Sequence, residues 1–158
     1  MNKLFIPYVM GNKHFIENVK TLSNVGADII EVGVPFSDPV ADGPVIMDAG
    51  NKAIQEGVNI QFILDQLTKH RDEIQSDYVL MTYYNIINYY GEEDFLQACE
   101  RAGVYGLIIP DLPHELVQQF KSRHPHRKTK IISLIAMTTS ESRSDQIAKD
   151  AEGFIYTV

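Results

Sequence analysis

Six short segments rich in β-branched and aromatic residues recur along the chain, and stretches with the spacing of amphipathic helices separate them. We predict strands over residues 4–9, 28–32, 78–82, 106–109, 130–136 and 153–158. The last helix is expected to begin near Thr139 or Ser140 and to turn Ile147, Ala148 and Ala151 inward. Apolar strands that alternate with helices are typical of a parallel sheet covered on both faces, so we expect an α/β fold.

Two architectures fit this alternation, an open doubly wound sheet and a (β/α)8 barrel. No G-x-G-x-x-G or G-x-x-x-x-G-K-[ST] motif follows a predicted strand, so the dinucleotide fingerprint and the P-loop are both absent. In both architectures, ligands are handled at the carboxyl ends of the strands and in the loops that follow. We therefore expect the reactive side chains at these ends.

Composition and charge narrow the function classes. The net charge of −7 argues against a general nucleic-acid surface, and no apolar run approaches the ~20 residues of a membrane span. The first residues lack the long apolar region of a secretory signal, and Cys99 is the only cysteine, which suits a reducing compartment. We expect a cytoplasmic protein without a nucleic-acid or membrane partner. Metal-site spacing is absent from the five histidines, which we expect on the surface: His14, His70, His114, His124 and His126.

Glu31 is the strongest anomaly among the predicted strands, because it interrupts an apolar run whose neighbours are typical of a sheet interior. An ionised carboxylate buried there is costly unless it is paired, so we expect its pKa to be raised. A carboxyl group of this kind can carry protons near neutral pH. The structural alternative is a glutamate salt-bridged to a basic residue, although no Lys or Arg falls at the carboxyl end of another predicted strand.

The loop after this strand, from Gly33 to Pro44, contains three prolines and two glycines. Proline fixes φ and glycine permits positive φ, so a loop of this composition is expected to be rigid. Such a loop can hold Asp38 or Asp42 over the ends of the strands. Asp-Pro and Asp-Gly pairs are also ordinary turn formers, which leaves a structural alternative open for each aspartate.

The run Ile30-Glu-Val-Gly-Val-Pro-Phe-Ser-Asp-Pro-Val-Ala-Asp-Gly43 resembles the signature of the tryptophan synthase alpha subunit family at every specified position. Residues 5–8, 81–85, 106–113 and 153–156 extend the resemblance over the whole chain. The resemblance implies a (β/α)8 barrel that cleaves indole-3-glycerol phosphate into indole and glyceraldehyde 3-phosphate in tryptophan biosynthesis. It also implies an α2β2 assembly with a beta subunit that carries pyridoxal phosphate, and no metal or cofactor on this chain.

The resemblance assigns the acid/base role to Glu31 and makes Asp42 the second catalytic carboxylate. Cleavage requires that indole C3 gain a proton, that the side-chain hydroxyl lose one, and that charge on the ring N–H be stabilised. Glu31 suits the first two tasks, and Asp42, expected to stay ionised in a wetter loop, suits the third. Tyr156 is implied to line the indole pocket. Tyr8 and Tyr83 are expected to form apolar walls, with core packing as the alternative for all three tyrosines.

The length of the chain departs from the family pattern. A (β/α)8 barrel typically needs ~250 residues, so we expect 1–158 to be a single domain with about six βα units of an incomplete barrel. The loops that hold the substrate phosphate in the family would follow the last two strands, and substrate affinity should collapse without them. One hypothesis is the front portion of a working lyase. The other is a truncated, catalytically silent chain that retains at most a surface for the beta subunit, which residues 38–39 and 111–113 would form. A different phosphate-sugar barrel enzyme, such as an epimerase, fits the loop less well.

Overall fold

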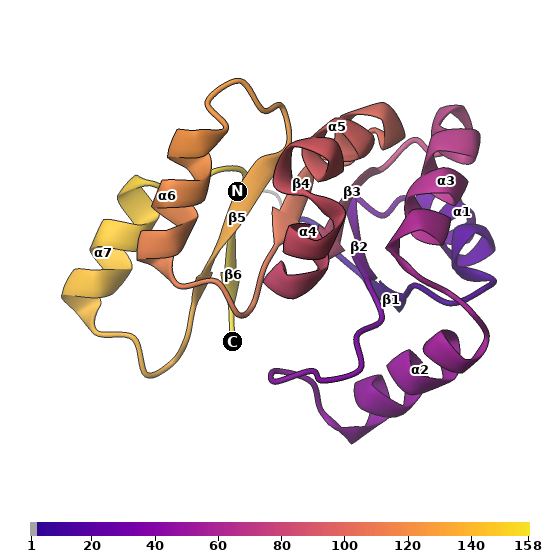
Figure 1. Cartoon of the computed structure of the whole chain (residues 1–158), viewed down its shortest axis with the longest axis horizontal. Coiled ribbons are helices and arrows are strands. Elements are labelled where there is room, and N and C mark those ends of the chain that lie inside the picture. Colours follow the sequence, from indigo (N-terminus) through magenta and orange to yellow (C-terminus); the bar gives the residue numbers. More distant parts are fainter. Residues whose placement is uncertain (1–2) are drawn as a thin grey trace.

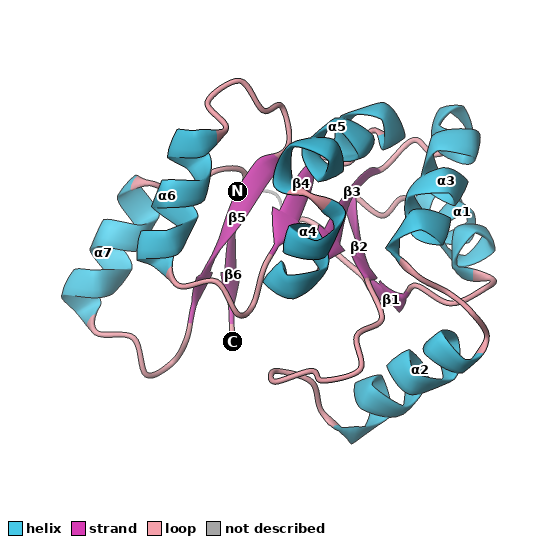
Figure 2. Ribbon diagram, in the orientation of Figure 1, coloured by secondary structure: helices cyan, strands magenta, loops and turns pink. Residues whose placement is uncertain are grey.

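A computed structural model describes residues 3–158 as six parallel strands with helices around them (Figures 1 and 2). Met1 and Asn2, the first residues of the predicted single domain, lie outside the described residues. The strands are β1 (Tyr8–Met10), β2 (Ile29–Gly33), β3 (Asp77–Met81), β4 (Gly106–Ile108), β5 (Lys130–Ile135) and β6 (Ile155–Thr157). The helices are α1 (Phe15–Asn24), α2 (Pro44–Gln55), α3 (Ile60–His70), α4 (Tyr84–Tyr90), α5 (Glu92–Ala102), α6 (His114–Arg123) and α7 (Glu141–Lys149), with a 3₁₀ turn η1 (Arg71–Glu73).

The order of the strands decides between the two predicted architectures. In space the order is β1-β2-β3-β4-β5-β6, and every neighbouring pair is parallel. A doubly wound sheet reverses its strand order at a switch point, whereas this sheet does not reverse. Figure 1 shows α1, α2 and α3 toward the β1 end and α6 and α7 toward the β6 end. The described chain therefore forms six consecutive strands of a (β/α)8 barrel and the helices that connect them, in agreement with the predicted incomplete barrel.

The two faces of the sheet have different neighbours. Ile30 and Val32 of β2 belong to a large apolar cluster that includes residues from the helices. Ile29 belongs to a smaller cluster built from strands β2, β3, β4 and β5. Because side chains alternate along a strand, Glu31 points to the same face as Ile29. That face is the inner side of the partial barrel.

Each predicted strand is present, although its ends shift. β1 begins at Tyr8 rather than at residue 4, yet the carbonyls of Phe5 and Pro7 already accept hydrogen bonds from the backbone of Asp28 and Glu31. No helix within residues 3–158 is both long enough and apolar enough to cross a membrane.

Helix α4 was not predicted from the sequence. Its residues, Tyr84 to Tyr90, are mostly aromatic, isoleucine or asparagine, types that favour strands or turns over helices. Its N-cap residue makes no side-chain capping hydrogen bond, so the usual local start signal is missing. The helix is stabilised instead by the Asp111 carboxylate, which accepts a hydrogen bond from the Tyr84 backbone N–H at 2.9 Å, by the burial of Ile87, and by a hydrogen bond from the Tyr84 hydroxyl to Glu92. Tertiary contacts therefore outweigh the local preference here.

Two of the five histidines expected on the surface are largely buried, so that prediction was wrong for them. The side chains of His114 and His124 expose only 8% and 10% of their area. His124 lies between two acids, with Nε2 2.6 Å from Glu92 Oε2 and Nδ1 3.2 Å from Glu93 Oε2. His114 Nε2 lies 3.2 Å from Asp150 Oδ2. These acidic partners come from other elements, and the local sequence carries no sign of them.

The start of α7 agrees with the prediction only in position. Ser140 occupies the N-cap, but its side chain makes no capping hydrogen bond. Thr139 Oγ1 instead accepts a hydrogen bond from the backbone N–H of Ala136 at 3.0 Å. Ile147 is buried as expected, whereas Ala148 is exposed, because only the narrow face of the helix that carries Ile147 packs against the sheet.

Candidate active site

Glu31 lies on the inner face of β2, with 3% of its surface exposed. The strand register places it beside Tyr8 of β1 and Val79 of β3. Within residues 3–158, its Oε1 atom is buried without a hydrogen-bond partner, and no basic side chain pairs with the carboxyl group. The salt-bridged alternative is therefore wrong for the described chain. A buried polar atom without a partner marks a position suited to an incoming ligand.

Burial raises the pKa of Glu31 to about 7. A hydrogen bond donated by the Tyr156 hydroxyl opposes part of this rise, because it stabilises the carboxylate. Tyr156 reaches this position from β6, where it packs against the inner-face cluster. A carboxyl group with a pKa near neutral can both donate and accept a proton under ordinary conditions.

Asp42 lies just before α2, in the segment that follows β2, and its side chain is half-buried. Burial raises the pKa of Asp42 as well, while the larger rise belongs to Glu31. The expectation of a wetter aspartate beside a dry glutamate agrees with this difference in burial. The two carboxyl groups therefore differ in burial and in pKa, as the members of acid/base pairs commonly do.

Tyr8 brings a hydroxyl group close to both carboxyl groups. Burial, followed by the charges of Asp42 and Glu31, raises the pKa of Tyr8. The hydroxyl rests on Gly33, where an added Cβ would lie 2.0 Å from the Tyr8 oxygen. Glycine at this position is therefore what lets the tyrosine reach the site. The sequence predicted an apolar wall here and gave no sign of this placement of the hydroxyl.

Tyr83 is 4% exposed and stands at the N-cap of α4, two residues after the end of β3. Its ring stacks on Phe36 with the centroids 4.8 Å apart. Its hydroxyl oxygen accepts hydrogen bonds from the backbone N–H groups of Val40 and Ala41, each at 3.2 Å. Tyr83 lines, together with Tyr8 and Asp42, a cavity of about 10 Å³, which is about the space of one water molecule. All five predicted site residues thus surround the same end of the sheet.

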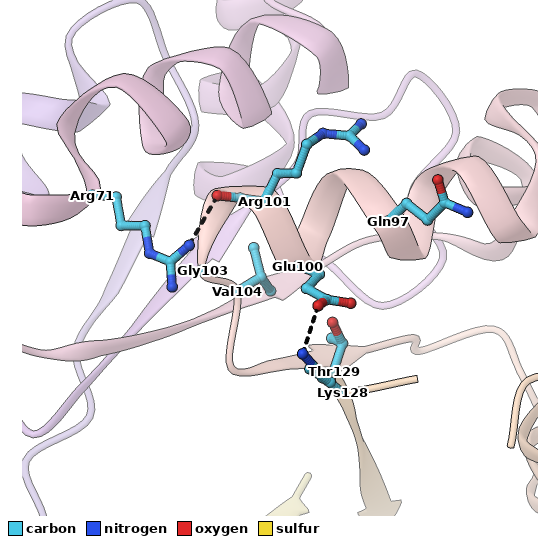
Figure 3. A pocket seen from close by; sticks show the side chains of 8 residues that line it. All are labelled: Arg71, Gln97, Glu100, Arg101, Gly103, Val104, Lys128 and Thr129. Carbon is cyan, nitrogen blue, oxygen red and sulfur yellow. Dashed lines mark hydrogen bonds and ion pairs between the residues drawn. The ribbon is translucent and has the colours of Figure 1, made fainter. Parts of the chain in front are cut away.

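A larger cleft of about 640 Å³ lies elsewhere on the molecule (Figure 3). Its lining comes from segments just before β4 and β5, so it lies at the amino ends of the strands, opposite the carboxyl pair. Lys128 Nζ lies 2.9 Å from Glu100 Oε1, and Arg71 Nη1 donates a hydrogen bond to the Arg101 carbonyl at 3.2 Å. These contacts hold the C-terminal end of α5, which is a structural role. In the part of the chain that the structure describes, no three His, Cys, Asp or Glu side chains gather as metal ligands.

The strand order and the position of the carboxyl pair define a protein of the (β/α)8-barrel class with a candidate site at the carboxyl ends of its strands. The family model described as tryptophan synthase alpha chain matches residues 1–158. The chain belongs to this family.

Relatives and solved structures agree with the assignment. The chain is 83% identical to the tryptophan synthase alpha chain of Staphylococcus saprophyticus and 65% identical to that of Staphylococcus epidermidis, each over the whole of this chain. It spans only 66% and 65% of the length of these curated relatives. The tryptophan synthase alpha subunit of Legionella pneumophila is 31% identical, with a TM-score of 0.92 over 99% of this chain and 62% of that one. A tryptophan synthase complex from Pyrococcus furiosus also has a TM-score of 0.92, at 29% identity, over 99% of this chain and 66% of that one.

Proposed function

We propose that this chain acts in tryptophan biosynthesis as a carbon–carbon lyase that cleaves indole-3-glycerol phosphate into indole and glyceraldehyde 3-phosphate. Its place would be the cytoplasm. The observation that carries the proposal is the carboxyl group of Glu31, which is buried, has no basic partner within the described chain, and has a pKa raised to about 7. Membership of the tryptophan synthase alpha chain family supports the choice of substrate.

In this mechanism the protonated Glu31 gives its proton to C3 of the indole ring. The ring nitrogen becomes positively charged, and the ionised Asp42 stabilises it through the ring N–H. The bond between C3 and the glycerol chain then breaks, and its electron pair returns to the ring. The side-chain hydroxyl becomes the aldehyde of glyceraldehyde 3-phosphate as its proton passes to Glu31. The glutamate is thereby restored, and no metal or organic cofactor takes part on this chain.

The proposed partner is a beta chain that carries pyridoxal phosphate and receives the indole in an α2β2 assembly. One solved neighbour is described as the tryptophan synthase α2β2 complex of Pyrococcus furiosus, which supports this arrangement. The segments 38–39 and 111–113 are largely exposed near the carboxyl ends of the strands, as a partner surface must be. An apolar cleft of about 680 Å³ beside the first of these segments, lined by Phe36, Ile86 and Tyr89 among others, extends that surface.

A second candidate is a chain that contacts the partner but is catalytically silent. Barrels of this class commonly bind phosphate in the loops after strands seven and eight, and the described residues, 3–158, form six strands. The two candidates can be distinguished by adding the C-terminal third of a relative and measuring whether the joined protein releases indole.

The test measures indole release from indole-3-glycerol phosphate by the 158-residue chain, alone and joined to the C-terminal third of the Staphylococcus saprophyticus relative. We expect release from the joined protein and none from the chain alone. Glu31→Gln should lower kcat of the joined protein by about 10²–10⁴-fold, because it removes the proton and keeps the size. Asp42→Asn should lower kcat less, and Asp48→Asn, an exposed change of the same charge on α2, should leave it unchanged. Near-normal turnover of Glu31→Gln would overturn the role of Glu31, and no release by the joined protein would overturn the lyase.

A further inference from the structure

The loop that carries Asp42, residues 35–42, has few attachments to the rest of the protein. The backbone N–H of Val34, just before it, bonds the carbonyl of Met81, and Gly43, just after it, caps α2. Between these two points, the hydrogen bonds that join the loop to other described residues both end on one atom, the Tyr83 hydroxyl oxygen. The hydrogen bond between Ser37 and Asp38 stays within the loop.

Tyr83 is well placed to hold this loop. Its ring is fixed by burial and by stacking on Phe36, which belongs to the same loop. A hydroxyl oxygen has two acceptor lone pairs, and the N–H groups of Val40 and Ala41 occupy both. Tyr83 therefore holds the loop at two places, by stacking on the Phe36 ring and by hydrogen bonds to the backbone up to Ala41, the residue before Asp42.

The surroundings show why this attachment matters for Asp42. Val40 is 78% exposed, so packing of its own side chain does not hold the loop. The charge of Asp42 helps to raise the pKa of Tyr83, after burial, which places the carboxyl group near the phenol. Tyr83 and Asp42 also line the same small cavity. Loss of the two backbone hydrogen bonds would free the peptide groups that set the direction of this carboxyl group.

We propose that Tyr83 is a positioning residue, whose hydroxyl holds the backbone N–H groups of Val40 and Ala41 and thereby fixes the Asp42 carboxyl group over the carboxyl ends of the strands. The catalytic consequence rests on the proposed lyase function. The placement itself concerns only the 158-residue chain and can be measured without substrate.

The first experiment compares Tyr83→Phe with Tyr84→Phe in the 158-residue chain. Tyr83→Phe keeps the stacked ring and removes only the acceptor, whereas the Tyr84 hydroxyl bonds Glu92 away from the loop. Amide hydrogen exchange followed by NMR should become at least about tenfold faster at Val40 and Ala41 in Tyr83→Phe alone. The titration of Asp42 should also move toward the ordinary aspartate range, because a freed loop exposes the carboxyl group to water. Unchanged exchange and titration in Tyr83→Phe would overturn the proposal.

The second experiment measures indole release by the joined protein. Tyr83→Phe should lower kcat by about 10- to 100-fold with little change in KM, because misplacement of a catalytic group costs rate. In the Asp42→Asn background the same change should cost less than about twofold, since no carboxylate remains to be positioned. Equal losses in both backgrounds would show that Tyr83 acts elsewhere. If the unsubstituted joined protein releases no indole, the proposed function fails, while the exchange and titration results still decide the placement of Asp42.

Discussion

Glu31 combines two properties that rarely occur together in a stable strand, nearly complete burial and a carboxyl group without a basic partner in the described chain. An uncompensated charge at such a position is costly, so the folded chain holds the proton more tightly than the unfolded chain does. The raised pKa that suits this group to proton transfer is therefore also a property of stability, and it can be tested without substrate.

The pH dependence of unfolding tests Glu31 directly. Its pKa is about 7 in the folded chain, against 4.5 as the ordinary value. The stabilisation that this proton provides is complete below 4.5 and is lost as the pH rises through 7. The Glu31→Gln variant has no titrating group at this position. Its free energy of unfolding should therefore fall by about 1–3 kcal/mol less than that of the unsubstituted chain when the pH rises from about 5 to 8. Urea unfolding across this range measures the difference. Glu141→Gln, an exposed change on α7, serves as the control, and parallel profiles for all three proteins would contradict the prediction.

The residues of the candidate site differ in how far the sequence could reveal them. Glu31 could be predicted, because an acid inside an apolar strand is a local pattern and strand burial follows from neighbouring residues. The contact between Tyr83 and the loop could not be predicted. Tyr83 is 43 positions from Val40 and 42 from Ala41, and it contacts their backbone N–H groups, which residues of almost any type would provide. His124 was misjudged for the same reason, because Glu92 lies 32 positions away.

At the scale of elements, the fit between β1 and β2 depends on the missing side chain of Gly33. An added Cβ would lie 2.0 Å from the Tyr8 hydroxyl oxygen, so Gly33→Ala must displace this tyrosine. We expect a loss of about 1–3 kcal/mol in the free energy of unfolding, as for other overpacked sites. Gly43→Ala is the matched control, since nothing lies within 4 Å of its Cβ position and its φ of −78° suits alanine. Urea unfolding of both variants checks the prediction, which equal stabilities would contradict.

A second junction joins α4, α5 and α6 at the carboxylate of Glu92. It accepts hydrogen bonds from Tyr84, from His124, and from Arg123 through Nε and Nη2 at 3.1 and 2.7 Å. The guanidinium of Arg123 is the main reason that the pKa of Glu92 falls to about 2. This stabilisation is complete above the ordinary value of 4.5 and is lost as the pH falls toward 2.

The prediction for this junction is a loss on Glu92→Gln of about 1–3 kcal/mol at neutral pH, because a charged acceptor is replaced by a neutral one. The loss should shrink as the pH falls through the range between 4.5 and 2. Asp94→Asn removes an exposed acid from the same turn of α5 and should cost much less. Thermal unfolding of the two variants measures the contrast, and equal destabilisation would sink the idea that the carboxylate joins the three helices.

The element pattern could be predicted where hydrophobic periodicity is local, as in α1 and α5, whose buried residues recur at helical spacing. It failed at α4, where the aromatic and isoleucine residues between Tyr84 and Tyr90 favour a strand by themselves. Tertiary contacts make that segment helical, among them the packing of Ile87, the Tyr84–Glu92 hydrogen bond and the bond from the Tyr84 N–H to Asp111. Local preference therefore predicts an element when the tertiary contacts agree with it.

At the scale of the whole molecule, the unreversed strand order places every carboxyl end on one side, and this is why residues from β1, β2, β3 and β6 meet at one site. The same order leaves an end strand on each side of the described sheet. Within residues 3–158, β1 pairs with β2 alone and β6 pairs with β5 alone. β6 is also poorly covered, with Ile155 partly exposed beside its free edge. Unpaired strand edges of this kind recruit strands from other chains.

We therefore predict that the 158-residue chain by itself self-associates as its concentration rises, through the edges of β1 and β6. Joining the C-terminal third of the Staphylococcus saprophyticus relative should suppress the association, because further strands would pair with these edges. Light scattering coupled to size-exclusion chromatography, over a wide range of concentration, measures the mass of both proteins. Ile155→Lys in the unjoined chain places a charge beside the free edge and should weaken the association without the added segment. A mass that does not change with concentration would contradict the prediction, and equal association of the joined and unjoined proteins would place the contact away from the sheet edges.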